Sequence, residues 1–175
     1  MKSTFYESNA LDEDQLKRWC VANNLEYHMC ELKDLDNCDS RYSFIFTGAT
    51  PNHINDGHDH HWLFLDGNLV FDSYGKTDYQ LPSHFQYLKN EPKQLQNYNS
   101  TVCGEYCCLF YKFLNENANL SPEEIGEAFS HEYGLTSNRE KNDQKILSAF
   151  HASKKAHSNA ETPDESSSSE DDTRA

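Results

Sequence analysis

Basic residues are scarce in this sequence of 175 residues. It contains 15 Lys and Arg against 29 Asp and Glu, which gives a formal net charge of −14. No run of Lys and Arg is long enough to form a basic patch. A surface of this sign repels nucleic acid and anionic membranes. We therefore expect a protein or peptide partner of basic character, and neither a DNA cofactor nor a membrane partner.

Long apolar segments are also absent. The first 15 residues contain no apolar core of signal-peptide length, and no other stretch reaches membrane-spanning length. These absences predict an intracellular protein of the cytoplasm or nucleus, where thiols stay reduced. Six cysteines are present, but three of them crowd residues 103–108, and no CxxC or HxxxH zinc spacing occurs. We expect free thiols, no bound metal and no cofactor.

Secondary structure is predicted from apolar periodicity and from turn and cap residues. The ten Phe and ten Tyr are enough for one hydrophobic core. Asp12 with Gln15, and Ser121 with Pro122 and Glu124, are typical helix starts. The predicted helices span residues 11–24, 103–115, 122–130 and 139–151. The predicted strands span residues 26–32, 41–47, 61–65 and 68–73.

These elements predict an α+β domain over residues 1–150. The helix over 103–115 is apolar on almost every side, as expected of a buried central helix. A small antiparallel or mixed sheet would pack on it, with a hairpin turn at Asp66-Gly67. Residues 75–93 look irregular, with one short helix near His84. The Ser-rich acidic residues 151–175 predict a disordered tail.

Four polar residues have the types that a thiol acyl-transfer site requires. Cys103 begins the buried helix, where the helix dipole favours a thiolate, and Gly104 beside it leaves room for a substrate backbone. His61 opens an apolar strand, and Asp72 returns toward it on the second hairpin strand, where it can fix the imidazole tautomer. Gln96 carries an amide that can donate to an oxyanion.

Each of these residues also has an ordinary structural explanation. A buried cysteine usually serves packing, a histidine at a strand end often lies on the surface, and an Asp at a strand end often caps a turn. A zinc site at residues 58–61 is a further alternative. Consecutive side chains of an extended chain point apart, however, so this spacing disfavours zinc.

The order of the four residues resembles the adenovirus protease (adenain) family and, more distantly, the SUMO-processing proteases. The resemblance lies in HWLFL, VFDSYG and QNYNSTVCGEYCCLF, and it covers residues 40–115. It implies an adenain-like cysteine protease fold, with Cys103 as nucleophile, His61 as base and Asp72 as its orienter. It also implies Gln96 and the Cys103 backbone N–H as oxyanion donors. Trp62 and Gly104 would line the substrate cleft.

The resemblance further implies a monomeric cysteine endopeptidase that cleaves after small residues such as Gly. Its substrates would be structural proteins of a virus or mobile element, which is compatible with packaging in a virion. Adenain joins its peptide activator through a Cys shortly before the Gln, and no Cys lies between Lys76 and Gln96 here. Three alternatives remain open: removal of ubiquitin-like modifiers, an inactive relative that only binds protein, and a metal-binding domain built on the His-rich loop.

Overall fold

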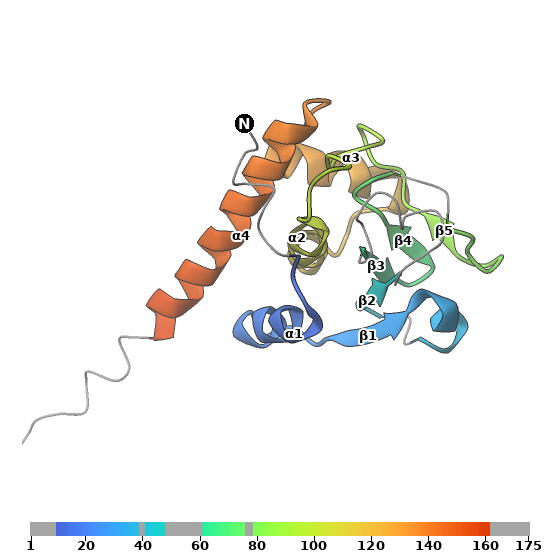
Figure 1. The fold of residues 1–175 in the computed structure, drawn as a ribbon, viewed down its shortest axis with the longest axis horizontal. Coiled ribbons are helices and arrows are strands. Elements are labelled where there is room, and N and C mark those ends of the chain that lie inside the picture. Colours follow the sequence, from blue (N-terminus) through green and yellow to red (C-terminus); the bar gives the residue numbers. More distant parts are fainter. Residues whose placement is uncertain (1–9, 39–40, 48–60, 76–78, 162–175) are drawn as a thin grey trace, which may run out of the picture.

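Five strands form one mixed sheet in the order β1-β2-β3-β4-β5 (Figure 1). The computed structural model describes residues 10–38, 41–47, 61–75 and 79–161. The two inner pairings, β2 with β3 and β3 with β4, are antiparallel, whereas the outer strands β1 and β5 pair in parallel. The strands are β1 (His28–Glu31), β2 (Ser43–Phe46), β3 (Trp62–Asp66), β4 (Leu69–Phe71) and β5 (Gln86–Tyr87).

Four α-helices and one 3-10 helix complete the described part of the chain. They are α1 (Glu13–Ala22), η2 (Leu32–Asn37), α2 (Cys103–Glu116), α3 (Pro122–Tyr133) and α4 (Arg139–Glu161). Helix α2 is the central element, and it packs on β3, on α1 and on α4 (Figure 1). The predicted α+β class, with a mixed sheet packed on a buried helix, is confirmed. None of the helices within the described ranges is long and apolar enough to cross a membrane.

Successive strand residues point to opposite sides of the sheet. Both faces are buried, each in its own hydrophobic cluster. Phe44, Phe64 and Phe71 belong to the larger core, which includes α2. There, Phe71 stacks on Phe110 of α2 with ring centroids 4.2 Å apart. The opposite face packs in a smaller cluster made by Leu35, Ile45, Leu63, Leu65, Val70 and Tyr79. Aromatic packing on one face and mainly aliphatic packing on the other therefore fix the position of the β3–β4 hairpin.

The predicted helix starts are confirmed. The Asp12 side chain accepts the Gln15 backbone N–H at 2.8 Å, and the Gln15 side chain accepts the Asp12 backbone N–H at 2.9 Å. Ser121 and Glu124 form the same type of capping box at the start of α3, with Pro122 in the first turn. Gly134 ends that helix with a φ of 65°, a conformation that glycine adopts easily.

Three predictions of secondary structure need correction. Asp66 pairs with Leu69, so the hairpin turn is Gly67-Asn68, one residue later than predicted. The prediction of a short helix near His84 is wrong, because that segment forms a turn and then β5. The Gln86 N–H of β5 donates to the Asn68 carbonyl oxygen at 2.8 Å. Helix α4 continues to Glu161. The expected tail is therefore helical over its first residues, where no Gly or Pro interrupts the helix; residues 162–175 lie outside the described ranges.

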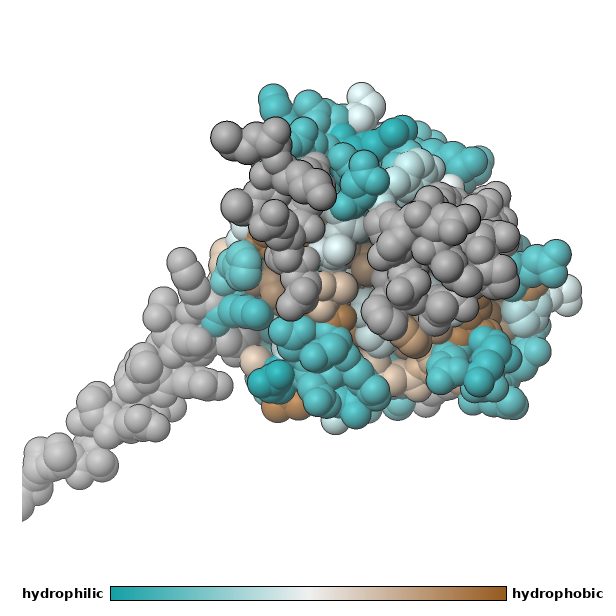
Figure 2. Space-filling model, in the orientation of Figure 1, coloured by the Kyte–Doolittle hydropathy of each residue, from teal (hydrophilic) through white to brown (hydrophobic). Residues whose placement is uncertain are grey.

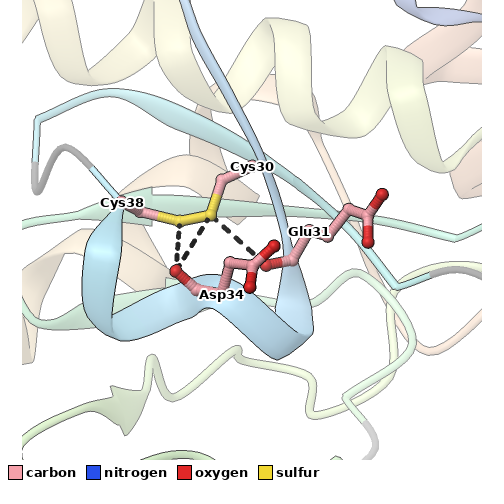
Figure 3. The surroundings of a disulfide bond; sticks show 4 residues. All are labelled: Cys30, Glu31, Asp34 and Cys38. Atoms are coloured by element: carbon pink, nitrogen blue, oxygen red, sulfur yellow. Dashed lines mark hydrogen bonds between the residues drawn. A yellow bond between two sulfur atoms is a disulfide. The ribbon is translucent and has the colours of Figure 1, made fainter.

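The expectation of free thiols is wrong for one pair, since Cys30 and Cys38 form a disulfide (Figure 3). Strand β1 leads directly into η2, which brings the two Cα atoms to 5.9 Å, a normal separation for a disulfide. Both sulfur atoms also lie close to the Asp34 carbonyl oxygen, at 3.6 and 3.5 Å. The disulfide closes a short loop that contains η2. The other four cysteines are free.

Candidate active site

The β3–β4 hairpin brings His61 and Asp72 together at the end of the sheet. His61 immediately precedes β3, and Asp72 immediately follows β4. The imidazole Nε2 lies 2.8 Å from Asp72 Oδ1, and both side chains are almost completely buried. Asp72 Oδ1 also accepts the Tyr74 backbone N–H at 2.9 Å. The hairpin therefore places the Asp72 carboxylate beside the His61 ring, and the Tyr74 backbone holds the carboxylate there. Its role as the orienter of His61 stays a prediction.

Cys103 belongs to the same site as the first residue of α2. Its sulfur accepts the Trp62 backbone N–H at 3.4 Å. One helical turn later, Cys107 donates its thiol to the Trp62 carbonyl oxygen, also at 3.4 Å. Because β4 ends at Phe71, these two polar groups of Trp62 lie beyond the pairing with β4. The start of α2 occupies that position, so Cys103 lies next to the residue that follows His61.

The surroundings of His61 favour a protonated imidazole. Burial by itself lowers the pKa of this ring, but the Asp72 carboxylate and the Cys103 sulfur together raise it to about 9. The Nδ1 atom makes no hydrogen bond of ordinary geometry to a described residue. Since Asp72 occupies Nε2, Nδ1 is the nitrogen that remains for Cys103. With a pKa of about 9, the ring is an imidazolium at neutral pH, and its positive charge lies beside the Cys103 sulfur.

The other free cysteines lack this environment. Burial raises the pKa of Cys20 to about 12. Burial, with the charges of neighbouring groups, raises the pKa of Cys107 and of Cys108 well above the ordinary value. These three side chains are neutral thiols that pack in the core. Among the free cysteines, only Cys103 combines a helix start with a charged partner.

Gln96 belongs to the same buried network, but its amide is already engaged. Its Nε2 donates to the carbonyl oxygen of Ser100 at 3.2 Å and to the hydroxyl of Ser100 at 3.0 Å. Its Oε1 accepts the hydroxyl of Ser73. The structure thus places Gln96 as a support for the segment just before Cys103. Its role as an oxyanion donor stays a prediction.

The two predicted cleft residues meet the segment that precedes α1. Trp62 donates its indole N–H to the Leu11 carbonyl oxygen at 2.9 Å. A Cβ added to Gly104 would lie 3.0 Å from Leu11 Cβ, so the Leu11 side chain fills the space beside this glycine. Cys103 itself is only 2% exposed. Sequence reasoning missed Leu11, because nothing in the local pattern indicates a contact across so many residues.

Sequence reasoning also missed a layer of polar residues behind the site. Asp143 on α4 accepts the Tyr106 hydroxyl at 2.9 Å and the Asn97 backbone N–H at 3.3 Å. Its neighbour Asn142 donates to the Leu95 carbonyl oxygen at 3.0 Å. Both residues are fully buried, but an Asn-Asp pair in a helix looks like an exposed one in the sequence, so no local signal indicated this layer. Together they anchor residues 95–100, the segment that leads to Cys103.

Within the described ranges, no group of three or more His, Cys, Asp or Glu side chains is arranged to hold a metal ion. The alternative zinc site depends mainly on residues 58–60, which lie outside those ranges. In comparisons with known protein families, curated proteins and solved structures, nothing matches this chain.

Proposed function

We propose that this protein is a cysteine peptidase with Cys103 as nucleophile, His61 as general base and acid, and Asp72 as the group that orients His61. One observation carries the proposal: a cysteine at a helix start, an imidazole and a carboxylate converge at one buried point. There, Asp72 Oδ1 lies 2.8 Å from His61 Nε2, and the Cys103 sulfur lies 3.4 Å from the backbone nitrogen of Trp62, the residue after His61. Ordinary packing does not require this combination of groups.

The residues support a complete acyl transfer. The Cys103 thiolate attacks the scissile carbonyl carbon, and the new oxyanion accepts hydrogen bonds, one of them from the Cys103 backbone N–H. The C–N bond breaks as His61 gives its proton to the leaving amine. Water then attacks the thioester carbonyl carbon while His61 takes a proton from the water, and the C–S bond breaks. The products are a carboxylic acid and the restored thiolate.

The substrate proposal comes from the sequence resemblance to the adenain family and from the acidic charge. We propose cleavage after small residues, Gly in particular, in structural proteins of a virus or mobile element. An adenain-like fold, action as a monomer and packaging in a virion belong to the same proposal. Removal of a ubiquitin-like modifier uses the same chemistry. A panel of Gly-Gly-X peptides and of SUMO and ubiquitin fusions separates the two.

A second candidate function is protein binding without cleavage, and the closure of the site favours it. Cys103 and His61 are 2% and 1% exposed, and Leu11 covers Gly104. The amide of Gln96 is engaged by Ser100. A site that stays closed in this way binds a partner elsewhere and does not react with small thiol reagents.

Alkylation with iodoacetamide at neutral pH, followed by peptide mapping, tests the proposal. The peptidase predicts fast modification of Cys103 that slows in His61→Ala. Cys103→Ala should abolish hydrolysis of the peptide panel, whereas Cys108→Ala, a packing variant, should keep it. Equal slow labelling of all free thiols, or preferential labelling of Cys107, would contradict the proposal and favour the binding function.

A further inference from the structure

A groove of about 950 Å³ runs along β1, between the start of α1 and η2. Its size lies within the range of ligand-binding pockets. Leu11, Met29, Phe46 and Trp62 are among its apolar lining residues. Figure 2 shows hydrophilic surface over α1 and over the η2 region, with a less polar strip between them. The groove therefore has an apolar floor between two polar walls.

One end of the groove lies at the candidate active site. Trp62 lines the groove, and its backbone N–H donates to the Cys103 sulfur at 3.4 Å. Leu11 also lines it and contacts Gly104, the residue after Cys103. An extended chain that follows the groove toward Trp62 would therefore approach Cys103.

Carboxylates line both walls. Asp12 and Glu13 come from the start of α1, and Glu31 and Asp34 come from the segment beside the disulfide (Figure 3). Among the described lining residues, Lys17 is the one lysine, and it pairs with Glu13 at 3.3 Å. Two of the carboxylates have other partners: Asp12 caps α1, and Glu31 pairs with an exposed lysine, Lys33, at 3.1 Å. An exposed ion pair such as that of Glu31 with Lys33 contributes little, so a cationic ligand can displace it.

We propose that this groove binds an extended segment of the protein substrate that is rich in Lys and Arg, on the side of Trp62 away from Cys103. The aliphatic stems of Lys and Arg suit the apolar floor, and their charged ends reach the acidic walls. The net charge of −14 adds a long-range attraction for such a segment. The inference deepens the proposed peptidase function and rests on it.

Binding to the Cys103→Ala protein tests the groove without cleavage. Fluorescence anisotropy would compare a labelled extended peptide that carries Lys and Arg with the same peptide carrying Gln at those positions. At low salt, we expect the basic peptide to bind at least about tenfold more tightly. The difference should shrink as salt rises, because screening weakens exposed charges. Equal affinity of the two peptides would overturn the proposal.

A double variant locates the effect. Glu31→Gln with Asp34→Asn should reduce the preference for the basic peptide by about three- to tenfold. The matched control, Glu123→Gln with Glu127→Gln on α3, removes the same charge at exposed positions far along the chain and should leave the preference unchanged. Equal effects of the two pairs would assign the preference to net charge and reject the groove.

Hydrolysis by the wild-type protein separates the two proposals. If it cleaves peptides and the charge of the segment has no effect, the groove proposal fails while the peptidase stands. If the groove variants weaken binding and no peptide is cleaved, the groove stands while the peptidase fails.

Discussion

The ring of Tyr74 lies almost parallel to the imidazole of His61, with centroids 4.4 Å apart and an interplanar angle of 19°. The same residue holds Asp72 through its backbone N–H. Its hydroxyl donates to the Ser100 carbonyl oxygen at 3.0 Å. Tyr74 thus connects the hairpin, which carries the base, with the segment that leads to the nucleophile. Tyr74 is therefore a positioning residue, since its role in holding these two segments together needs no contact with the reacting atoms.

Replacing Tyr74 separates its two contributions. Tyr74→Phe keeps the stacked ring and loses the hydrogen bond to Ser100, so we expect kcat to fall about tenfold with KM unchanged. Tyr74→Leu also loses the ring that stacks on His61, so kcat should fall further. Tyr133→Phe on α3 removes the same atom outside the site and serves as the control. Steady-state kinetics on a cleaved peptide measures the effect, and a change in KM alone would contradict a positioning role.

Asp72→Asn should move the pH dependence of kcat/KM as well as lower its value. The charge of Asp72 helps to raise the pKa of His61 to about 9, so its removal should shift the alkaline limb to lower pH. The rate at the optimum should fall on the order of 10²- to 10⁴-fold, because the ring loses its fixed tautomer. Asp66→Asn, at the far end of the same hairpin, is the matched control. An unmoved limb would show that Asp72 does not set the protonation of His61.

Gln96→Glu tests whether this residue supports the loop, the oxyanion or both. The change keeps the shape and removes both N–H donors, so Ser100 loses two hydrogen bonds. We expect stability to fall by about 1–3 kcal/mol in urea unfolding. If the amide turns to the oxyanion during reaction, the rate of acylation of the folded protein also falls on the order of 10²-fold. Gln80→Glu, at an exposed position, is the control. Full stability together with full activity would exclude both roles.

Local patterns were sufficient for much of the fold. The capping boxes at Asp12 and Ser121 depend on residues only three apart, and the hairpin depends on a two-residue turn. The buried position of α2 follows from its apolar composition. The proximity of His61 and Asp72 was also predictable from local sequence, since a hairpin brings the residues at its two ends together.

Contacts between distant parts of the chain were not predictable in this way. Strand β5 contains two residues, Gln86 and Tyr87, and it pairs in parallel with β4, a strand distant from it in the sequence. The disulfide depends on the path of the chain through η2. Asp143 becomes a neighbour of Asn97 only after α4 packs on α2. These features depend on the assembled core, which no short stretch of sequence encodes.

The buried carboxyl of Glu105 on α2 makes stability depend on pH. This side chain is 5% exposed, and its Oε1 has no hydrogen-bond partner among the described residues. Burial raises its pKa from 4.5 to about 7. Its contribution to stability is therefore complete below about pH 4.5 and is lost as pH rises to about 7. Glu105→Gln should stabilise the protein by up to about 3 kcal/mol at pH 8 and by little at pH 4.5. Urea unfolding at both pH values measures this, with Glu127→Gln on the surface of α3 as control, and an equal gain at the two pH values would contradict the assignment.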